Sequence, residues 1–175
     1  NLEFAETGEL ASLSQALQSR RGRFQPTIVS YGDVLFNKYI PQALCQEQDD
    51  CVIFVDSNWR DQSSYARLGG FAECSIPNSR KAFNAKIHLK QLGKTLPEES
   101  IHGVWMGFLK LSSSAASQVN DLLLDMLADP ANRRAGIPQL LQALLKQDVP
   151  VRVLYTVGHW LDVNSLEDVV QAGNF

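Results

Sequence analysis

The chain has 175 residues, of which 45% are hydrophobic and 20% charged, and its formal net charge is −3. This size and balance fit one globular domain with a full core. They exclude the strongly basic surface that binds a nucleic acid polymer or an anionic membrane. We therefore predict that residues 1–175 form a single domain that binds neither.

The cysteines and the apolar runs bear on where the protein resides. The three cysteines show no spacing typical of a metal site, and an odd number does not fit a set of disulfides. Because no signal peptide is recognisable, we expect reduced thiols and a cytoplasmic location. No apolar run approaches the roughly 20 residues that a membrane-spanning helix needs.

In the first half of the chain, apolar periodicity predicts helices alternating with strands. Thr7 is the expected N-cap of the first helix, and Pro41 is expected in the first turn of the second. The continuous apolar run at 51–56 indicates a strand buried on both faces. The expected elements are a helix over 7–19, a strand over 27–33, a partly helical stretch over 35–46, a strand over 51–56 and a short strand near 70–75.

In the second half, Ser112 and its neighbours cap a helix that ends at Asp129-Pro130, and Ser165 with Asp168 forms a capping-box-like pair. Strands that alternate with helices indicate an α/β fold, here a Rossmann-like, mixed and mostly parallel sheet flanked by helices. The expected elements are strands over 85–92 and 104–111, a helix from 112, a helix over 137–145, strands over 149–156 and 160–163, and a last helix from 165.

Two acids follow strands at opposite ends of the chain. Asp33 closes the stretch Thr27–Asp33, and Asp162 follows the strand that begins near Trp160. Ligands of open α/β sheets bind just outside the carboxyl ends of strands, so both acids are well placed to hold a metal or a phosphate. The alternative is that Gly32-Asp33 forms an ordinary turn.

These segments resemble, in order and spacing, the nucleotidyltransferases of the nucleotide-diphospho-sugar transferase superfamily. The most similar branch activates small headgroups, phosphocholine or phosphonates such as aminoethylphosphonate, with CTP. The resemblance covers nearly the whole chain. It rests on IVSYGDVLF at 28–36, VIFVD at 52–56 with Trp59, MGFLKLS at 106–112, and HWLDVN at 159–164 with Glu167-Asp168.

The resemblance implies that Asp33 and Asp162 hold Mg²⁺ on the phosphates of CTP or another nucleotide. Nucleotidyl transfer brings an anionic oxygen onto an anionic phosphorus, and a hard cation on oxygen ligands neutralises the repulsion. Two carboxylates from distant strands suit this task if the fold brings the strand ends to one cleft.

Basic and aromatic residues near the strand ends are expected to bind the phosphonate or phosphate acceptor. Lys110 and Arg60 are the candidate catalytic cations, although both could be ordinary surface residues. Asp56 could contact a headgroup amine, with Trp59 offering a cation–π surface or serving only as a loop anchor. Tyr31, in the Tyr-Gly-Asp element, is assigned to substrate binding.

The resemblance is incomplete at its start. Members of the family begin with a strand leading into a glycine-rich loop, Gly-x-Gly-x-Arg with a following Pro-Lys, that cradles the triphosphate. This chain has no such stretch, since Gly8 is isolated and Gly69-Gly70 lies elsewhere. We therefore expect an N-terminally truncated domain, the C-terminal two-thirds or so of a nucleotidyltransferase. A second departure is Val104, where relatives often carry glutamate.

Three functions stay open at this point. The first is a nucleotidyltransferase that is active only with its missing N-terminal unit. The second is a non-catalytic binding or oligomerising domain that covers an open sheet edge in a homo-oligomer. The third is a metal-dependent glycosyltransferase with Asp56-Ser57-Asn58 as its metal motif, which leaves Asp162 unexplained.

Overall fold

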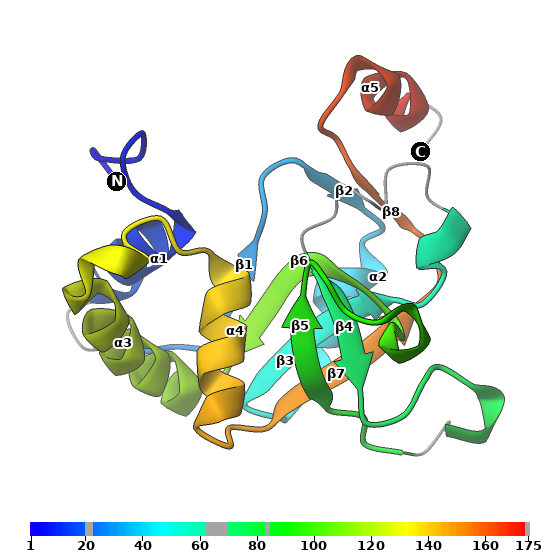
Figure 1. The fold of residues 1–175 in the computed structure, drawn as a ribbon, viewed down its shortest axis with the longest axis horizontal. Helices are drawn as coiled ribbons and strands as arrows, with labels where there is room; N and C mark the ends of the chain where they lie inside the picture. The colour runs from blue at the N-terminus through cyan, green and yellow to red at the C-terminus, as the bar shows by residue number, and fades with distance from the viewer. Residues whose placement is uncertain (20–22, 62–69, 83–84, 174–175) are drawn as a thin grey trace.

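A computed structural model describes residues 1–19, 23–61, 70–82 and 85–173. It shows a mixed α/β fold with helices on both sides of a central sheet (Figure 1). The strands are β1 (Thr27–Ser30), β2 (Val34–Phe36), β3 (Cys51–Asp56), β4 (Phe71–Cys74), β5 (Leu89–Gly93), β6 (Gly103–Leu111), β7 (Val151–Thr156) and β8 (Trp160–Asp162). The main sheet has the order β5-β4-β6-β3-β7 with β1 also on β6, while β2 and β8 pair separately.

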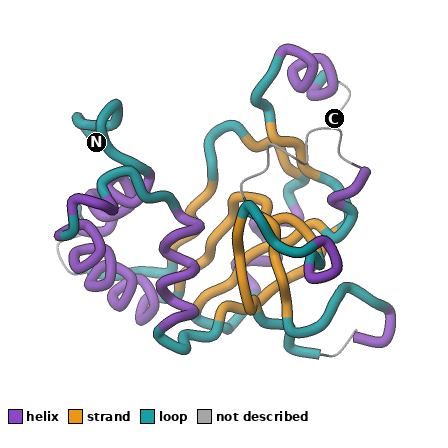
Figure 2. The backbone as a smooth tube through the Cα atoms, in the orientation of Figure 1, coloured by secondary structure: helices purple, strands orange, loops and turns teal. Residues whose placement is uncertain are grey.

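Four helices divide between the two faces of the main sheet, and the C-terminal helix lies beside β8 (Figure 2). One hydrophobic cluster joins the sheet to α1, α3 and α4, and a second joins the opposite face to α2. None of the helices described is both long and apolar enough to cross a membrane. The helices are α1 (Glu9–Gln18), α2 (Tyr39–Gln46), α3 (Ser113–Ala128), α4 (Ile137–Lys146) and α5 (Leu166–Ala172).

Strand β3 shows why its sequence reads as one apolar run. Cys51, Ile53 and Val55 pack in the cluster below α1, α3 and α4. Val52 and Phe54 alternate with them and pack against α2. Because both faces of the strand are covered, every position requires an apolar side chain or a fully bonded one. The predicted two-sided burial is confirmed.

Strand β6 is the centre of the sheet, and all nine of its residues are buried. One of its edges pairs with β3. Its other edge is shared, since β1 pairs with residues 108–111 and β4 with residues 103–104. Gly107 lies between the two and has a φ of +81°. A Cβ at Gly107 would lie 2.7 Å from Tyr31 Cδ2, so the glycine lets the Tyr31 ring lie against the strand.

Most of the predicted elements are present, and the mixed α/β class is confirmed. The strand directions differ from the expectation of a mostly parallel sheet. Within the described residues, β3 and β7 run parallel and the other ladders of the main sheet are antiparallel. The reason is β6, which runs opposite to each of its three neighbours and so reverses most of the pairings.

The N-cap of the first helix is also different from the prediction. Gly8, and not Thr7, occupies this position, and no side chain caps it. A Cβ on Gly8 would lie 2.3 Å from the carbonyl oxygen of Ala135. The two backbones approach so closely here that only glycine fits. Its N–H donates to the carbonyl oxygen of Arg133 at 2.8 Å. The Thr7 hydroxyl bonds instead to the carbonyl oxygen of Glu3.

Gly107 provides a test of the packing at the centre of the sheet. We expect Gly107→Ala to lower the free energy of unfolding by about 3 kcal/mol, since it adds a left-handed backbone cost to a steric clash with Tyr31. Gly158 also has a positive φ, but a Cβ there meets no atom within 4 Å. Gly158→Ala should therefore cost about 1 kcal/mol. The measurement is urea-induced unfolding of both variants.

Gly32→Ala serves as the control for this series. Its Cβ also enters open space, and its φ lies outside the left-handed range. The unfolding free energy of Gly32→Ala should stay within about 0.5 kcal/mol of the wild type. Equal losses in Gly107→Ala and Gly158→Ala would contradict the proposed clash with Tyr31.

Candidate functional site

The short ladder between β2 and β8 brings Asp33 and Asp162 together from opposite ends of the chain. Val34 pairs with Asp162 in an antiparallel register. The backbone N–H of Val163 donates to the carbonyl oxygen of Asp33 at 2.8 Å. Asp162 is thus opposite Val34 and Asp33 is opposite Val163, so the two acids lie diagonally across one end of the ladder. Asp33 is exposed, whereas Asp162 is half-buried.

The two carboxylates repel each other. Partial burial raises the pKa of Asp162, and the charges of Asp33 and Asp168 raise it further, while a hydrogen bond with Asn164 opposes the shift. A nearby cation would relieve this repulsion. No cluster of three or more metal-binding side chains occurs among the described residues, so a cation here would have two protein ligands. That is the number with which Mg²⁺ commonly binds when substrate phosphates and waters complete its shell.

Asp56 is buried, with 1% of its surface exposed, and its hydrogen bonds are structural. Its Oδ2 accepts from Trp160 Nε1–H at 2.8 Å. Its Oδ1 accepts from the backbone N–H of Asn58 at 2.9 Å and of Gly158 at 3.1 Å. A buried carboxylate requires such partners, and here they tie the end of β3 to the turn before β8. Asp56 therefore positions the strand that carries Asp162, and we leave it out of the proposed substrate contacts and of a glycosyltransferase metal motif.

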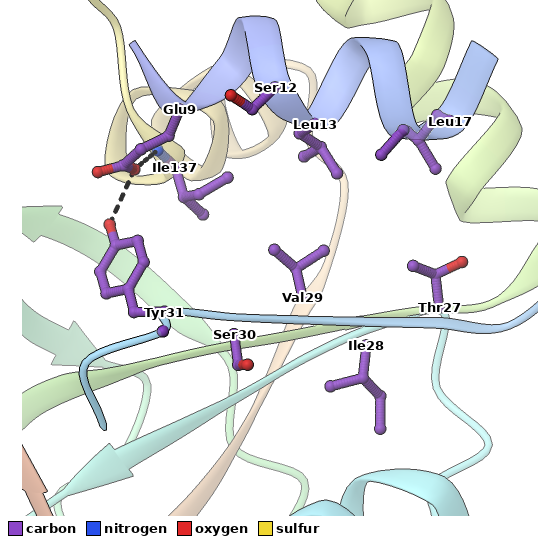
Figure 3. Close-up of a pocket in the computed structure, with 12 residues that line it drawn as sticks. Glu9, Ser12, Leu13, Leu17, Thr27, Ile28, Val29, Ser30, Tyr31 and Ile137 are labelled. Carbon is purple, nitrogen blue, oxygen red and sulfur yellow. Dashed lines mark hydrogen bonds between the residues drawn. The ribbon is translucent and has the colours of Figure 1, made fainter. Parts of the chain in front are cut away.

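Tyr31 lies between the metal candidates and the first helix. Its hydroxyl donates to Glu9 Oε2 at 2.9 Å, and the same oxygen accepts from the backbone N–H of Ile137 at 2.9 Å (Figure 3). Burial, followed by the charge and hydrogen bond of Glu9, raises the pKa of Tyr31; Asp33 and Asp162 add to this. Tyr31 thus stays a neutral donor beside the acidic pair. With Trp160 and Asp162 it also lines a small cavity of about 60 Å³.

A groove of about 510 Å³ runs between α1 and β1 (Figure 3). Thr27, Val29 and Tyr31 point toward α1, whereas Ile28 and Ser30 point to the other side of the strand. Because Tyr31 N–H bonds to Gly107, alternation along the antiparallel ladder directs the backbone groups of Ile28 and Ser30 away from β6. In the described residues β1 pairs with β6 alone, so its outer edge can accept a further strand.

Trp59 and Arg60 form a second recess with residues from β4 and the loop before β6. The Arg60 guanidinium lies 4.4 Å from the centre of the Trp59 ring, and its Nη2 is 3.2 Å from Glu98 Oε1. Phe71 meets the Trp59 ring edge-on at a centroid distance of 5.4 Å. These residues and Ile101 line a pocket of about 430 Å³. Trp59 and Arg60, both predicted as site residues, therefore line the same pocket.

Lys110 makes its hydrogen bonds to a different part of the chain, the segment after α2. Its side chain is 6% exposed, and its ammonium donates to the backbone carbonyl oxygens of Glu47 and Asp49 at 3.1 and 2.6 Å. These carbonyls belong to the segment between α2 and β3, and a buried ammonium that satisfies them has a sufficient structural role. The catalytic role predicted for Lys110 gains no support from these contacts, and we leave it out of the proposed site.

The roles of three residues at these sites were not predicted from the sequence. Glu9 and Glu98 carry no motif, because their partners Tyr31 and Arg60 are distant in sequence. Trp160 was placed in a strand and in the HWLDVN motif but was given no role, although its indole N–H is the donor to Asp56. A buried acid that follows an apolar strand needs a donor, and an indole is a donor with no acceptor function. That requirement is the one signal that could have linked Trp160 to Asp56.

The raised pKa of Asp162 leads to a prediction about stability and pH. A carboxyl group whose pKa is raised by folding stabilises the fold while protonated, and this contribution is lost as the pH rises through the folded pKa. In metal-free buffer at pH 7, Asp162→Asn should therefore stabilise the protein, by roughly 0.5 kcal/mol for charges largely in water. The gain should shrink as the pH falls toward about 4.

Urea unfolding at pH 7 and pH 4.5, in the presence of a chelator, measures this difference. Asp125→Asn, on the exposed side of α3, is the matched control for the loss of one surface acid. A loss of stability in Asp162→Asn at pH 7, equal to any loss at pH 4.5, would contradict the repulsion between the two acids.

Comparison with known proteins gives a result at the level of fold. No family model and no curated protein matches the chain. Among solved structures it is similar to the inositol-1-phosphate CTP transferase of T. maritima, with a TM-score of 0.64 and 16% identity over 93% of this chain and 58% of that one. It is also similar to the CTP:phosphocholine cytidylyltransferase of Streptococcus pneumoniae, with a TM-score of 0.65 and 11% identity over 99% and 66%.

A UDP-glucose pyrophosphorylase gives a TM-score of 0.68 at 14% identity, over 97% of this chain and 62% of that one. The chain thus spans less than two thirds of the length of each of these structures. The agreement extends over nearly all of the present chain and confirms the resemblance found in the sequence. The chain has the fold shared by these nucleotidyltransferase structures.

Proposed function

We propose that this chain is part of a nucleotidyltransferase that uses CTP and transfers its cytidylyl group to a small phosphate or phosphonate, such as phosphocholine or aminoethylphosphonate. The observation that carries the proposal is the β2–β8 ladder, at whose end Asp33 and Asp162 lie diagonally across from each other. Two solved structures of this fold are named for CTP-dependent transfer, to inositol 1-phosphate and to phosphocholine, and two others are named for thymidylyl transfer and for UDP-glucose. The choice of CTP therefore rests on the resemblance found in the sequence.

The donor set at this position fits a hard divalent cation. Asp33 and Asp162 are oxygen ligands, their mutual repulsion favours a cation, and Asp33 is open to solvent. We assign these two residues to Mg²⁺, which when bound would neutralise the phosphate charge of the nucleotide. Asp168 adds negative charge nearby but accepts from the backbone N–H groups of Asn164 and Ser165, as the cap of α5.

In the proposed reaction an oxygen of the acceptor phosphate or phosphonate attacks the α-phosphorus of CTP. A bond forms between them, the bond from the α-phosphorus to the β-phosphate oxygen breaks, and pyrophosphate leaves with the electron pair. The contribution of the protein is to place the reactants in line and to balance their charge. Tyr31 donates its hydroxyl proton to Glu9, and this bond fixes the ring beside the acids.

A second candidate function is a non-catalytic domain that binds a further strand or a second copy. Two features favour this second function: the unpaired outer edge of β1, among the described residues, and the groove between α1 and β1. An added strand can pair with such an edge and place its side chains in the groove. This function would make no demand on Asp33 or Asp162. The same binding experiment therefore separates the two candidates.

The experiment is titration calorimetry of CTP into the protein with and without Mg²⁺. We expect binding that requires Mg²⁺ and weakens at least tenfold in both Asp33→Asn and Asp162→Asn, because each variant removes one anionic ligand from a two-ligand site. Asp125→Asn removes an acid on the exposed side of α3 and should bind as the wild type does. Circular dichroism verifies that each variant is folded.

Two results would count against the proposal. One is a folded wild-type chain that takes up no CTP at millimolar concentration. The other is a loss of affinity in Asp125→Asn as large as in the two site variants. Concentration-dependent self-association without nucleotide binding would favour the second candidate.

A further inference from the structure

The stretch that leads into β5 carries positive charge without any acid. Residues 74–97 contain five lysines and arginines and no aspartate or glutamate, in a chain whose formal net charge is −3. Lys86, His88 and Lys90 alternate with two residues that are buried in the core, so their side chains point outward. Alternate side chains of an extended chain lie about 7 Å apart. These three residues therefore form a basic row on the surface.

A β-bulge sets the place of Lys90 in this row. Cys74 pairs with Leu89 and Glu73 pairs with Gln91, so Lys90 is an extra residue without a partner on β4. Bulges at the edge of a sheet re-aim a side chain in this way. Lys90 here lines a recess of about 390 Å³ between β5 and the end of α4. The other residues of the recess are Gln91, Gln142, Leu145 and Lys146.

The two lysines of the recess have no partners in the part of the chain that the structure describes. Neither Lys90 nor Lys146 forms an ion pair or a side-chain hydrogen bond there. Lys146 is not needed as a cap, since the carbonyls of residues 143–145 accept from backbone N–H groups of residues 147–149. Lys86, in contrast, pairs with Asp49 at 3.0 Å. The charge that is not neutralised therefore lies at the recess.

A hydrogen bond fixes the shape of the recess. Gln142 Nε2–H donates to the carbonyl oxygen of Leu92 at 2.6 Å, which ties α4 to β5. Leu145 is half-buried and adds apolar surface. Glu73, which lies opposite Gln91 on the ladder, is not among the lining residues. From the described residues that line the recess, an anion would meet two ammonium groups and two amides and no carboxylate.

The size of this surface distinguishes between classes of anion. Lys86 and Lys90 are about 13 Å apart along the extended chain, which is more than one phosphate can bridge. The acids of an extended peptide with an acid at every second position repeat at the spacing of the row, about 7 Å. Single-stranded nucleic acids bind by stacking on aromatic side chains, and none lines the recess among the described residues. An extended acidic peptide fits these features.

We propose that the row and the recess dock an extended acidic segment of a partner protein. One carboxylate lies between Lys90 and Lys146, and the acids that follow extend along the row toward Lys86. Charge complementarity carries this proposal. The described lining residues of the recess and of the cavity at Asp162 do not overlap. The proposal therefore goes beyond nucleotidyl transfer and does not depend on it.

The test uses a fluorescein-labelled peptide of alternating glutamate and serine, whose fluorescence anisotropy measures binding to the whole chain without nucleotide or metal. The control peptide has glutamine in place of glutamate and should not bind. Raising NaCl to about 0.3 M should weaken the binding of the acidic peptide, since exposed charges are screened. Inorganic phosphate, at the concentration of the carboxylates in the peptide, should compete poorly.

Variants identify the residues that bind the peptide. Lys90→Gln and Lys146→Gln should each weaken binding about threefold, the size expected for the loss of one exposed ion pair. Lys38→Gln removes the same charge from an exposed position at the start of α2 and should bind as the wild type does. Circular dichroism verifies that each variant is folded.

Four results would overturn the assignment. They are equal affinity for the acidic and the glutamine peptide, an equal loss in Lys38→Gln, full displacement by inorganic phosphate, and tighter binding of a single-stranded oligothymidylate of the same charge as the peptide. The last result would assign the surface to a nucleic acid. Loss of CTP binding would bear on the proposed function alone and would leave the peptide site standing.

Discussion

A buried carboxylate has to be hydrogen-bonded, and the way Asp56 meets this requirement determines the rest of the site. Its oxygens accept from the Trp160 indole and from the Gly158 backbone, so the end of β3 holds the turn that leads into β8. Gly158 and His159 both have left-handed backbone angles, which make that turn tight. Strand β8 can then pair with β2, and this ladder brings Asp162 to Asp33. Removing the acceptor would leave a buried indole N–H without its partner and release the strand that carries half of the acidic pair.

The acidic pair and the recess at Trp59 differ in how their charges are balanced. Asp33 and Asp162 place two negative charges together at a partly solvated position, which favours a cation. The aromatic and acidic recess is occupied by a cation from its own chain, held by an exposed and weak ion pair.

Much of the fold could be predicted from local patterns, because those patterns report local physics. The apolar run of β3 and the Ser165–Asp168 capping box depend on burial or on hydrogen bonds between neighbours in sequence, and both are present as expected. The antiparallel pairings of β6 and the choice of Gly8 as an N-cap depend on contacts between distant segments, which no local pattern reveals. The two acids could be selected from sequence, yet their proximity required the β2–β8 register. Asp56 had the same strand-end pattern as Asp33, and only burial distinguishes the anchor from the exposed acid.

The central claim is that Asp33 and Asp162 form one divalent cation site, and paramagnetic broadening by Mn²⁺ tests it most directly. With CTP present, trace Mn²⁺ should broaden the amide resonances of Asp33 and Val163 together, at the same metal concentration, because these groups are neighbours across the ladder. Excess Mg²⁺ should restore both, and either Asp33→Asn or Asp162→Asn should abolish the effect on the whole pair. Broadening confined to one of the two strands, or centred on other acids of the chain, would contradict the account.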